Sequence, residues 1–169
     1  MHTPSPGYSS GQRALHWIIA LMILPMIAAG FVMVQQGLPR ALGNTLFIMH
    51  KNMGVVVLIL VILRIVVKLR HKAPPLSEAL PAWQRRAAHA SHGLLYVLML
   101  VMPLSGYIRV RAGGFPIEAL DRLGLPTLVP KSEALAATAK AVHELGAYAI
   151  AALLALHIAA ALHLSLIHI

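Results

Sequence analysis

The sequence predicts an all-α membrane protein in which four transmembrane helices form a bundle. The composition is the first reason: 59% of the 169 residues are hydrophobic, 11% are charged and the mean hydropathy is +0.76, whereas soluble domains contain about 25% charged residues. The second reason is that the apolar residues fall into four separate runs, each close to the roughly 20 residues that a helix needs to cross a bilayer. The chain also has no cysteine, which excludes disulfides, thiolate zinc sites and c-type haem attachment.

The four apolar runs are predicted to cross the membrane as parts of a single domain that covers residues 1–169. A short turn around residues 35–44 follows the first run, and a basic, proline-containing loop follows the second. A longer loop from Arg109 to about Thr138 precedes the fourth, and all three connections contain the turn residues expected outside helices. The predicted spans cover residues 14–34, 46–67, 89–108 and 140–164.

A cleaved signal peptide is the alternative interpretation of the first span. Arg13 precedes this apolar run, and Ala28-Ala29-Gly30 resembles a cleavage site. The run is about 20 residues long, which exceeds the apolar region of a signal peptide. It also begins with His16 and Trp17, so we favour a span that is retained.

The positive charges predict the orientation of the spans. The chain has 14 Lys and Arg residues against 5 Asp and Glu, but no basic run is interleaved with aromatic residues, so a nucleic-acid partner is not expected. With the N-terminus inside, the cations divide equally between the two sides of the membrane. The loop between the second and third spans is short and dense in positive charge, and such loops favour the inner side. Both termini are therefore predicted to lie inside.

Four histidines within or beside the spans form a geometric pattern. His143 and His157 are 14 residues apart, which in a helix is about 21 Å of rise and about 40° short of four full turns. They therefore lie on one face of the helix at opposite depths of the membrane. His50 of the second span lies at the depth of His143, and His16 of the first span lies at the depth of His157. Two imidazoles that face each other across a helical bundle can hold an iron porphyrin, so two stacked haems fit. Each histidine taken alone is equally well interpreted as a polar residue hydrogen-bonded between helices.

The same 14-residue offset recurs on the other spans. Gly30 lies fourteen residues after the first histidine and Arg64 fourteen after the second, and the third span repeats the offset with His92 and Gly106. Gly30 would leave room for a porphyrin face at the outer layer, or would serve helix packing. Arg64 would meet a haem propionate at the inner layer, or would extend to the lipid headgroups. His89 and His92 share a face at the inner end, which favours interfacial positions or a quinone or propionate contact over a metal site.

At this point the sequence resembles the bacterial cytochrome b561 family. The resemblance covers nearly the whole chain and departs from the family only after the fourth span, where members continue into a basic cytoplasmic tail. It implies a bacterial inner-membrane protein with both termini cytoplasmic and two b-type haems, ligated by His16, His50, His143 and His157. The motifs that carry the resemblance are RALHW at 13–17, MHK at 49–51 with Gly54, AHASHG at 88–93, and the pair His143-Glu144 followed by His157.

The resemblance also implies a function, because small single-chain members of this family oxidise superoxide at the outer face and pass the electrons through both haems to ubiquinone. A basic outer surface attracts such an anion by long-range steering. The cations expected to steer it, Lys51 first among them because it neighbours His50, are Lys51, Arg109, Arg111 and Lys140. Alternatively, such cations bind lipid headgroups or pair with Glu118, Asp121 and Glu133.

Two other functions remain open at this stage. The first is a cytochrome b subunit that anchors a hydrogenase or formate dehydrogenase complex and accepts electrons from an iron–sulfur partner protein. The second is a haem-free carrier that uses its histidines for protons or divalent metal ions.

Overall fold

The described part of the chain is helical and confirms the predicted all-α membrane fold. The computed structural model describes residues 7–71 and 80–167, and side chains are described as far as residue 163. Four of its helices are long and apolar enough to cross a membrane. In chain order the helices are α1 (Ser10–Val32), α2 (Arg40–Arg70), α3 (Ala82–Ala112), the short α4 (Glu118–Arg122) and α5 (Glu133–Ile167).

Three of the four long helices extend beyond both ends of their predicted spans, whereas α1 ends at Val32, two residues before its predicted span does. Hydropathy marks the part of a helix that lies in hydrocarbon, whereas backbone hydrogen bonds continue into the polar interface. The predicted loop from Arg109 to about Thr138 accordingly contains the last turn of α3, all of α4 and the first turns of α5. The start of α1 is fixed by a capping box between Ser9 and Gln12.

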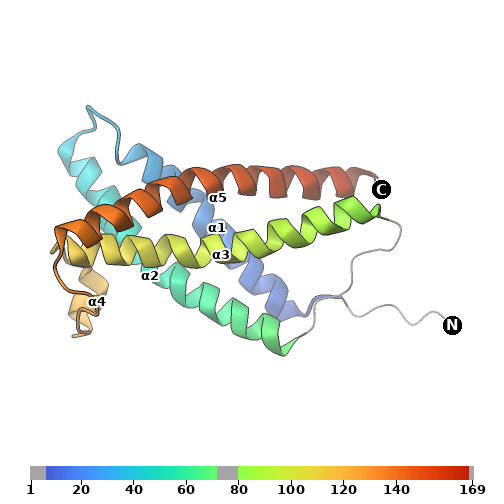
Figure 1. Cartoon of the computed structure of the whole chain (residues 1–169), viewed down its shortest axis with the longest axis horizontal. Helices are drawn as coiled ribbons and strands as arrows, with labels where there is room; N and C mark the ends of the chain where they lie inside the picture. The colour runs from blue at the N-terminus through green and yellow to red at the C-terminus, as the bar shows by residue number, and fades with distance from the viewer. Residues whose placement is uncertain (1–6, 72–79, 168–169) are drawn as a thin grey trace.

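The long helices form two packed pairs (Figure 1). α3 packs along α5 and α1 packs along α2, while α2 also contacts α3 and α4. The turn between α1 and α2 and the short α4 lie at one end of the bundle, which we call the α4 end. The first residues of α1 and the last described turns of α5 lie at the opposite end. The space that separates α1 and α2 from α5 is where the predicted histidine pairs would have to meet.

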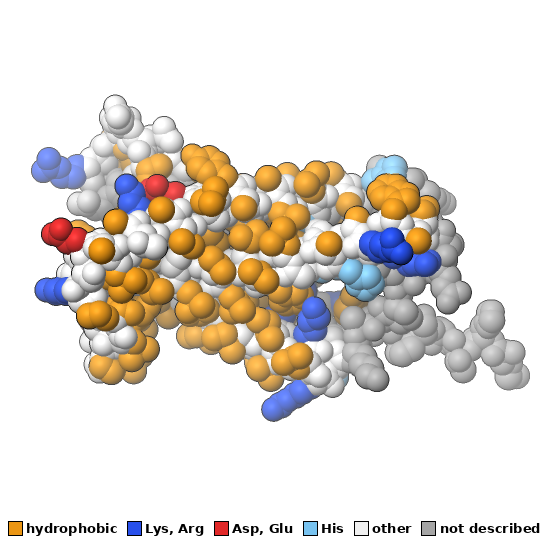
Figure 2. Space-filling model, in the orientation of Figure 1, with side chains coloured by type: hydrophobic (Ala, Val, Ile, Leu, Met, Phe, Trp, Pro, Cys, Tyr) orange, Lys and Arg blue, Asp and Glu red, His pale blue; other side chains and the backbone are white. Residues whose placement is uncertain are grey.

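The surface of the bundle suits a lipid environment. Figure 2 shows hydrophobic side chains over the middle of the molecule, while Lys and Arg lie toward both ends and Asp and Glu at the α4 end. The buried core is small and centres on Ile19, Val57 and Val61, whereas many large apolar side chains are exposed, including Leu21 at 67% and Leu156 at 67%. Exposed apolar area of this extent belongs in contact with lipid rather than water.

We expect Val61→Ala to destabilise the bundle by about 1–2 kcal/mol, because packing rather than water exclusion holds helices together in lipid. The Val61 side chain is fully buried at 0% exposure. The matched control is Ile62→Ala, because the neighbouring side chain is 49% exposed and lipid can fill the space it leaves. Thermal unfolding of the two purified variants measures the difference, and equal unfolding temperatures would contradict the assigned core.

Candidate functional site

The structure brings the four predicted histidines together in two pairs. His50 of α2 faces His143 of α5 with ring centroids 6.1 Å apart, and His16 of α1 faces His157 of α5 at 6.4 Å. A metal ion held between two imidazole nitrogens at about 2 Å from each would separate the ring centroids by roughly 6 Å. Both pairs therefore have the spacing that two axial ligands of one metal ion require.

Hydrogen bonds orient the imidazole of His143. Its Nδ1 lies 2.9 Å from the backbone carbonyl oxygen of Met102 and 3.2 Å from Oγ of Ser105. A carbonyl oxygen only accepts hydrogen bonds, so Nδ1 carries the proton and Nε2 keeps its lone pair. The hydroxyl of Ser105, a buried residue, itself donates to the same carbonyl at 3.0 Å. This arrangement is typical of a histidine that binds a metal through Nε2.

The opposing ring of His50 has no such hydrogen bond. Its Nδ1 is buried and has no partner within hydrogen-bond geometry among the described residues, although the backbone of Met26 in α1 lies near it. Two glycines make room for the rings of this pair. A Cβ atom at Gly30 would lie 3.2 Å from Cε1 of His50, and one at Gly106 would lie 3.1 Å from Cε1 of His143. The structure thus places Gly30 at the predicted layer, against an imidazole.

A cavity of about 320 Å³ surrounds the His50–His143 pair. Residues from α1, α2, α3 and α5 line it, and most of them are apolar. The cavity thus occupies the space between the two helix pairs. Cofactor pockets are typically concave, largely apolar and supplied with a few well-placed polar groups. An apolar cavity with two facing imidazoles fits an iron porphyrin.

The other histidine pair has a third imidazole beside it. His92 of α3 lies 5.4 Å from His157, closer than His16 does. The predicted propionate partner Arg64 also lies in this region, where its guanidinium is 5.8 Å from the ring of Tyr96 and 3.4 Å from the backbone oxygen of Gln12. Within the described residues no group of three or more His, Cys, Asp or Glu side chains could hold a metal ion by itself.

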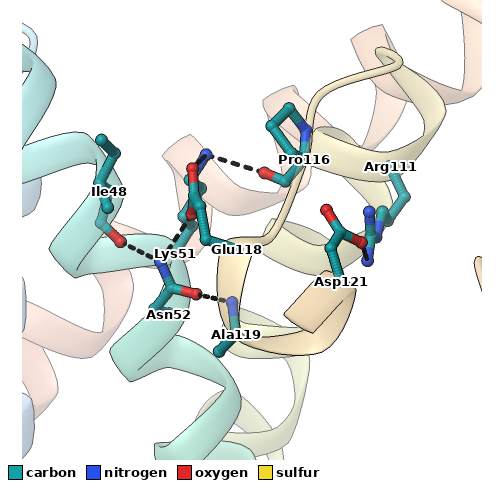
Figure 3. Close-up of polar contacts among 8 residues, drawn as sticks. All are labelled: Ile48, Lys51, Asn52, Arg111, Pro116, Glu118, Ala119 and Asp121. Carbon is teal, nitrogen blue, oxygen red and sulfur yellow. Dashed lines mark hydrogen bonds and ion pairs between the residues drawn. The ribbon is translucent and has the colours of Figure 1, made fainter. Parts of the chain in front are cut away.

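Lys51 is tied to α4 rather than free. Its ammonium lies 2.6 Å from the carboxylate of Glu118, donates to the backbone oxygen of Pro116 at 2.8 Å, and leaves the side chain 9% exposed (Figure 3). Burial raises the pKa of the Glu118 carboxyl, but hydrogen bonds from Lys51 and Asn52 outweigh this effect and hold the pKa below its ordinary value. The charge of Lys51 is thus largely neutralised within the protein.

The other three predicted steering cations differ in their surroundings. Arg111 is 7% exposed and its guanidinium lies 2.6 Å from Asp121, as Figure 3 shows. Lys140 has a looser, exposed pair with Glu144 at 3.6 Å. Arg109 lines the cavity of the His50–His143 pair, and no described carboxylate lies within ion-pair distance of it. The sequence left open whether the cations pair with Glu118, Asp121 and Glu133. The structure pairs Lys51 with Glu118 and Arg111 with Asp121, whereas no described cation pairs with Glu133.

Comparison with known families matches residues 7–168 to the prokaryotic cytochrome b561 family. The chain belongs to this family. It is 32% identical over 157 residues to cytochrome b561 homolog 1 of Escherichia coli (strain K12), covering 92% of this chain and 88% of the relative. It is 28% identical over 155 residues to the probable superoxide oxidase CybB of Yersinia pestis, covering 92% of this chain and 86% of the relative. Cytochrome b561 homolog 2 of E. coli is 27% identical over 150 residues, covering 89% and 80% of the two chains.

Membership confirms the resemblance found in the sequence and defines the class of protein. A cytochrome b561 is a membrane electron-transfer protein that binds b-type haem, and four apolar helices in this prokaryotic family indicate a multi-pass inner-membrane protein. The residues present fit this cofactor, because the imidazole spacing, the free Nε2 of His143 and the apolar cavity all suit an iron porphyrin.

Sequence reasoning missed three features of this cytochrome b561 site. The hydrogen bond from His143 to Met102 was missed because it uses a backbone carbonyl, which no residue pattern reveals. The helix α4 itself was missed because a five-residue helix carries no periodic signal, although pairing of its carboxylates with cations was among the alternatives. The closeness of His92 to His157 had a signal, since His92 begins the same 14-residue offset as the other histidines.

We expect Gly106→Val to lower the haem content of the purified protein. The added Cβ would already lie 3.1 Å from His143, and the two further methyl groups would push the imidazole off its axis. Gly93→Val is the matched control, because it makes the same change in the same helix at a position with nothing within 4 Å. A pyridine haemochrome assay counts the haem in each variant. Equal haem in both variants would show that the ring of His143 does not hold the cofactor.

Proposed function

We propose that this cytochrome b561 is a dihaem oxidoreductase that takes electrons from superoxide at the outer face and passes them to ubiquinone. The observation that carries the proposal is the presence of two histidine pairs at opposite depths of one bundle, each with the ring spacing expected of two histidines that would bind one metal ion. The proposed ligands are His50 with His143 for one haem and His16 with His157 for the other. The name of the Yersinia pestis relative, a probable superoxide oxidase, supports superoxide as the donor.

The proposed orientation places the α4 end outside and both termini in the cytoplasm. The His50–His143 layer then lies on the donor side and the His16–His157 layer on the quinone side. The positive charge at the end of α2, with Lys68 and Arg70 in its last turn, supports a cytoplasmic position for that end. Arg64 adds a cation near the second layer that can pair with a propionate, and Gly30 leaves room at the first.

The haems supply the one-electron chemistry: each superoxide gives up one electron to become dioxygen, and two electrons with two protons convert ubiquinone to ubiquinol. The protein's own part is to hold, orient and select. Met102 and Ser105 fix the protonated Nδ1 of His143, which leaves the lone pair of Nε2 available to a cofactor in the cavity that this residue lines. Most of the residues that line this layer are apolar, which disfavours water beside the cofactor. Because superoxide carries no proton that must be removed, no acid or base is required on the donor side.

Steering of the donor falls mainly to Arg109 among the four predicted cations. Arg111 is buried, the Lys51 side chain is only 9% exposed, and both are paired with carboxylates, so their fields are largely cancelled before they reach solvent. Lys140 is exposed but faces Glu144. Arg109 lines the cavity together with Lys51 and Glu144 and has no paired carboxylate among the described residues, so its positive charge is the least compensated one that an incoming anion meets there.

The wild-type protein is expected to contain about two haems per chain, and His50→Ala or His143→Ala about one, because a b-type haem with one remaining axial ligand is held weakly. His163→Ala is the control, since this histidine of α5 is exposed and outside both pairs. The pyridine haemochrome assay again gives the count. A haem-free wild-type protein after expression with ample haem would leave only the interpretation as a carrier of protons or metal ions.

We expect Arg109→Gln to lower the rate of superoxide-dependent ubiquinone reduction by about two- to fivefold at low ionic strength, one cation's share of the roughly tenfold or greater steering by a charged surface. The difference should shrink at high salt, because the Debye length falls to about 3 Å at 1 M. Arg122→Gln is the control, since it removes an equal charge from an exposed site on α4.

One result would contradict the role of Arg109, and another would contradict the function itself. A rate for Arg109→Gln that equals the control at low ionic strength would remove Arg109 from the mechanism. A wild-type protein that contains haem but does not accept electrons from superoxide would instead favour a relay subunit that takes them from a partner protein.

A further inference from the structure

The two imidazoles of the His50–His143 pair are held in different ways. The ring of His143 is oriented by its own hydrogen bonds to Met102 and Ser105. The buried Nδ1 of His50 has no hydrogen-bond partner among the described residues. The backbone of Met26 lies near this nitrogen and Gly30 near Cε1, but neither holds the ring by a hydrogen bond of full geometry. The direction of the His50 ring therefore depends mainly on the position and rotation of the α2 backbone that carries it.

The two residues that follow His50 clamp that part of α2 to α4 (Figure 3). The amide of Asn52 donates to Glu118 at 2.7 Å and accepts from the backbone N–H of Ala119 at 2.8 Å. Lys51 contacts the other oxygen of the same carboxylate at 2.6 Å. Together these residues form a small polar network in which the carboxylate and both ends of the amide have partners, which we call the α2–α4 latch.

We propose that Asn52 and Glu118 are positioning residues for His50: the latch fixes the rotation of α2 and thereby aims the His50 imidazole at His143. This inference rests on the proposed function, because it assigns His50 as an axial ligand. The inference goes beyond the proposed function because it names residues outside the cavity that orient His50.

The geometry shows why a small rotation matters. An imidazole about 6 Å from the axis of a helix moves by about 2 Å when the helix turns by roughly 20°. Metal–ligand distances tolerate only about 0.2 Å of error. Asn52 lies two residues after His50 and therefore on a different face of α2, so contacts there resist rotation without touching the ring. Ile117, which is 1% exposed and lines the same cavity, packs this segment against the bundle.

The test measures ligation rather than catalysis. Carbon monoxide binds a reduced haem only where an axial position opens, so the fraction of haem that reacts with it reports a displaced histidine. Asn52→Ala and Glu118→Ala should each raise this fraction about tenfold, the lower end of what loss of an outer-shell partner does to metal affinity. The effect should be limited to one of the haems.

Two further variants separate positioning from general loosening. Glu118→Gln keeps one of the two oxygen acceptors that Lys51 and Asn52 use but replaces the other with an N–H donor, so its reactive fraction should lie between those of the wild type and Glu118→Ala. Thr45→Ala removes a side-chain hydrogen bond at the same end of α2, but that bond goes only to the Ala41 carbonyl of α2 itself. Its reactive fraction should not change.

The outcomes distinguish this inference from the function on which it rests. Suppose that the wild-type protein contains haem and that the fraction of haem that binds carbon monoxide is the same in Asn52→Ala, Glu118→Ala and Thr45→Ala. This result would overturn the positioning role of the latch and leave the proposed function standing. Equal increases in all variants would also overturn it, because they would indicate a loosened bundle. A wild-type protein without haem would overturn the proposed function itself.

Discussion

The pairing of imidazoles across the bundle is the constraint on which the arrangement of the helices depends. A histidine in a hydrocarbon layer is costly unless it finds a partner, and α5 presents two on one face. One partner comes from α1 and the other from α2. α1 and α2 therefore have to face α5 across a gap as wide as two rings, while they pack closely on each other and α2 also packs on α3. The cavity between the helix pairs follows from this requirement.

The scarcity of carboxylates decides which cations remain available for function. All of the described carboxylates lie in α4 or in the first half of α5, and the two in α4 are used to bind that helix to its neighbours. Lys51 is thereby used to hold α4 against α2, and Arg111 to hold it against α3. A cation that the sequence places at the outer end of a span is thus not always accessible to a donor.

The histidine pairs were predictable because they depend on helical periodicity, which is a local property of the sequence. Hydropathy gave the number of spans, and the 14-residue offset gave the shared face of α5. The ends of the helices were not predictable in the same way. The apolar run of residues stops at the edge of the hydrocarbon layer, whereas the helix continues beyond it. Nor could the sequence decide between steering and pairing for Lys51, because its partner Glu118 is 67 residues away and carries no pattern that connects the two.

The two layers also differ in how their geometry can be disturbed. His143 and His157 share α5, so a displacement of that helix along α3 would move one ligand of each pair. His50 instead depends on α2 and on its contacts with α4, while His16 depends on α1. A change in the α2–α4 contacts therefore acts on one layer and leaves the other in place. The proposed orientation puts α4 on the donor side. The connection between α3 and α5 would then help to set the properties of a haem held by His50 and His143, although none of the charged side chains of α4 needs to touch that haem.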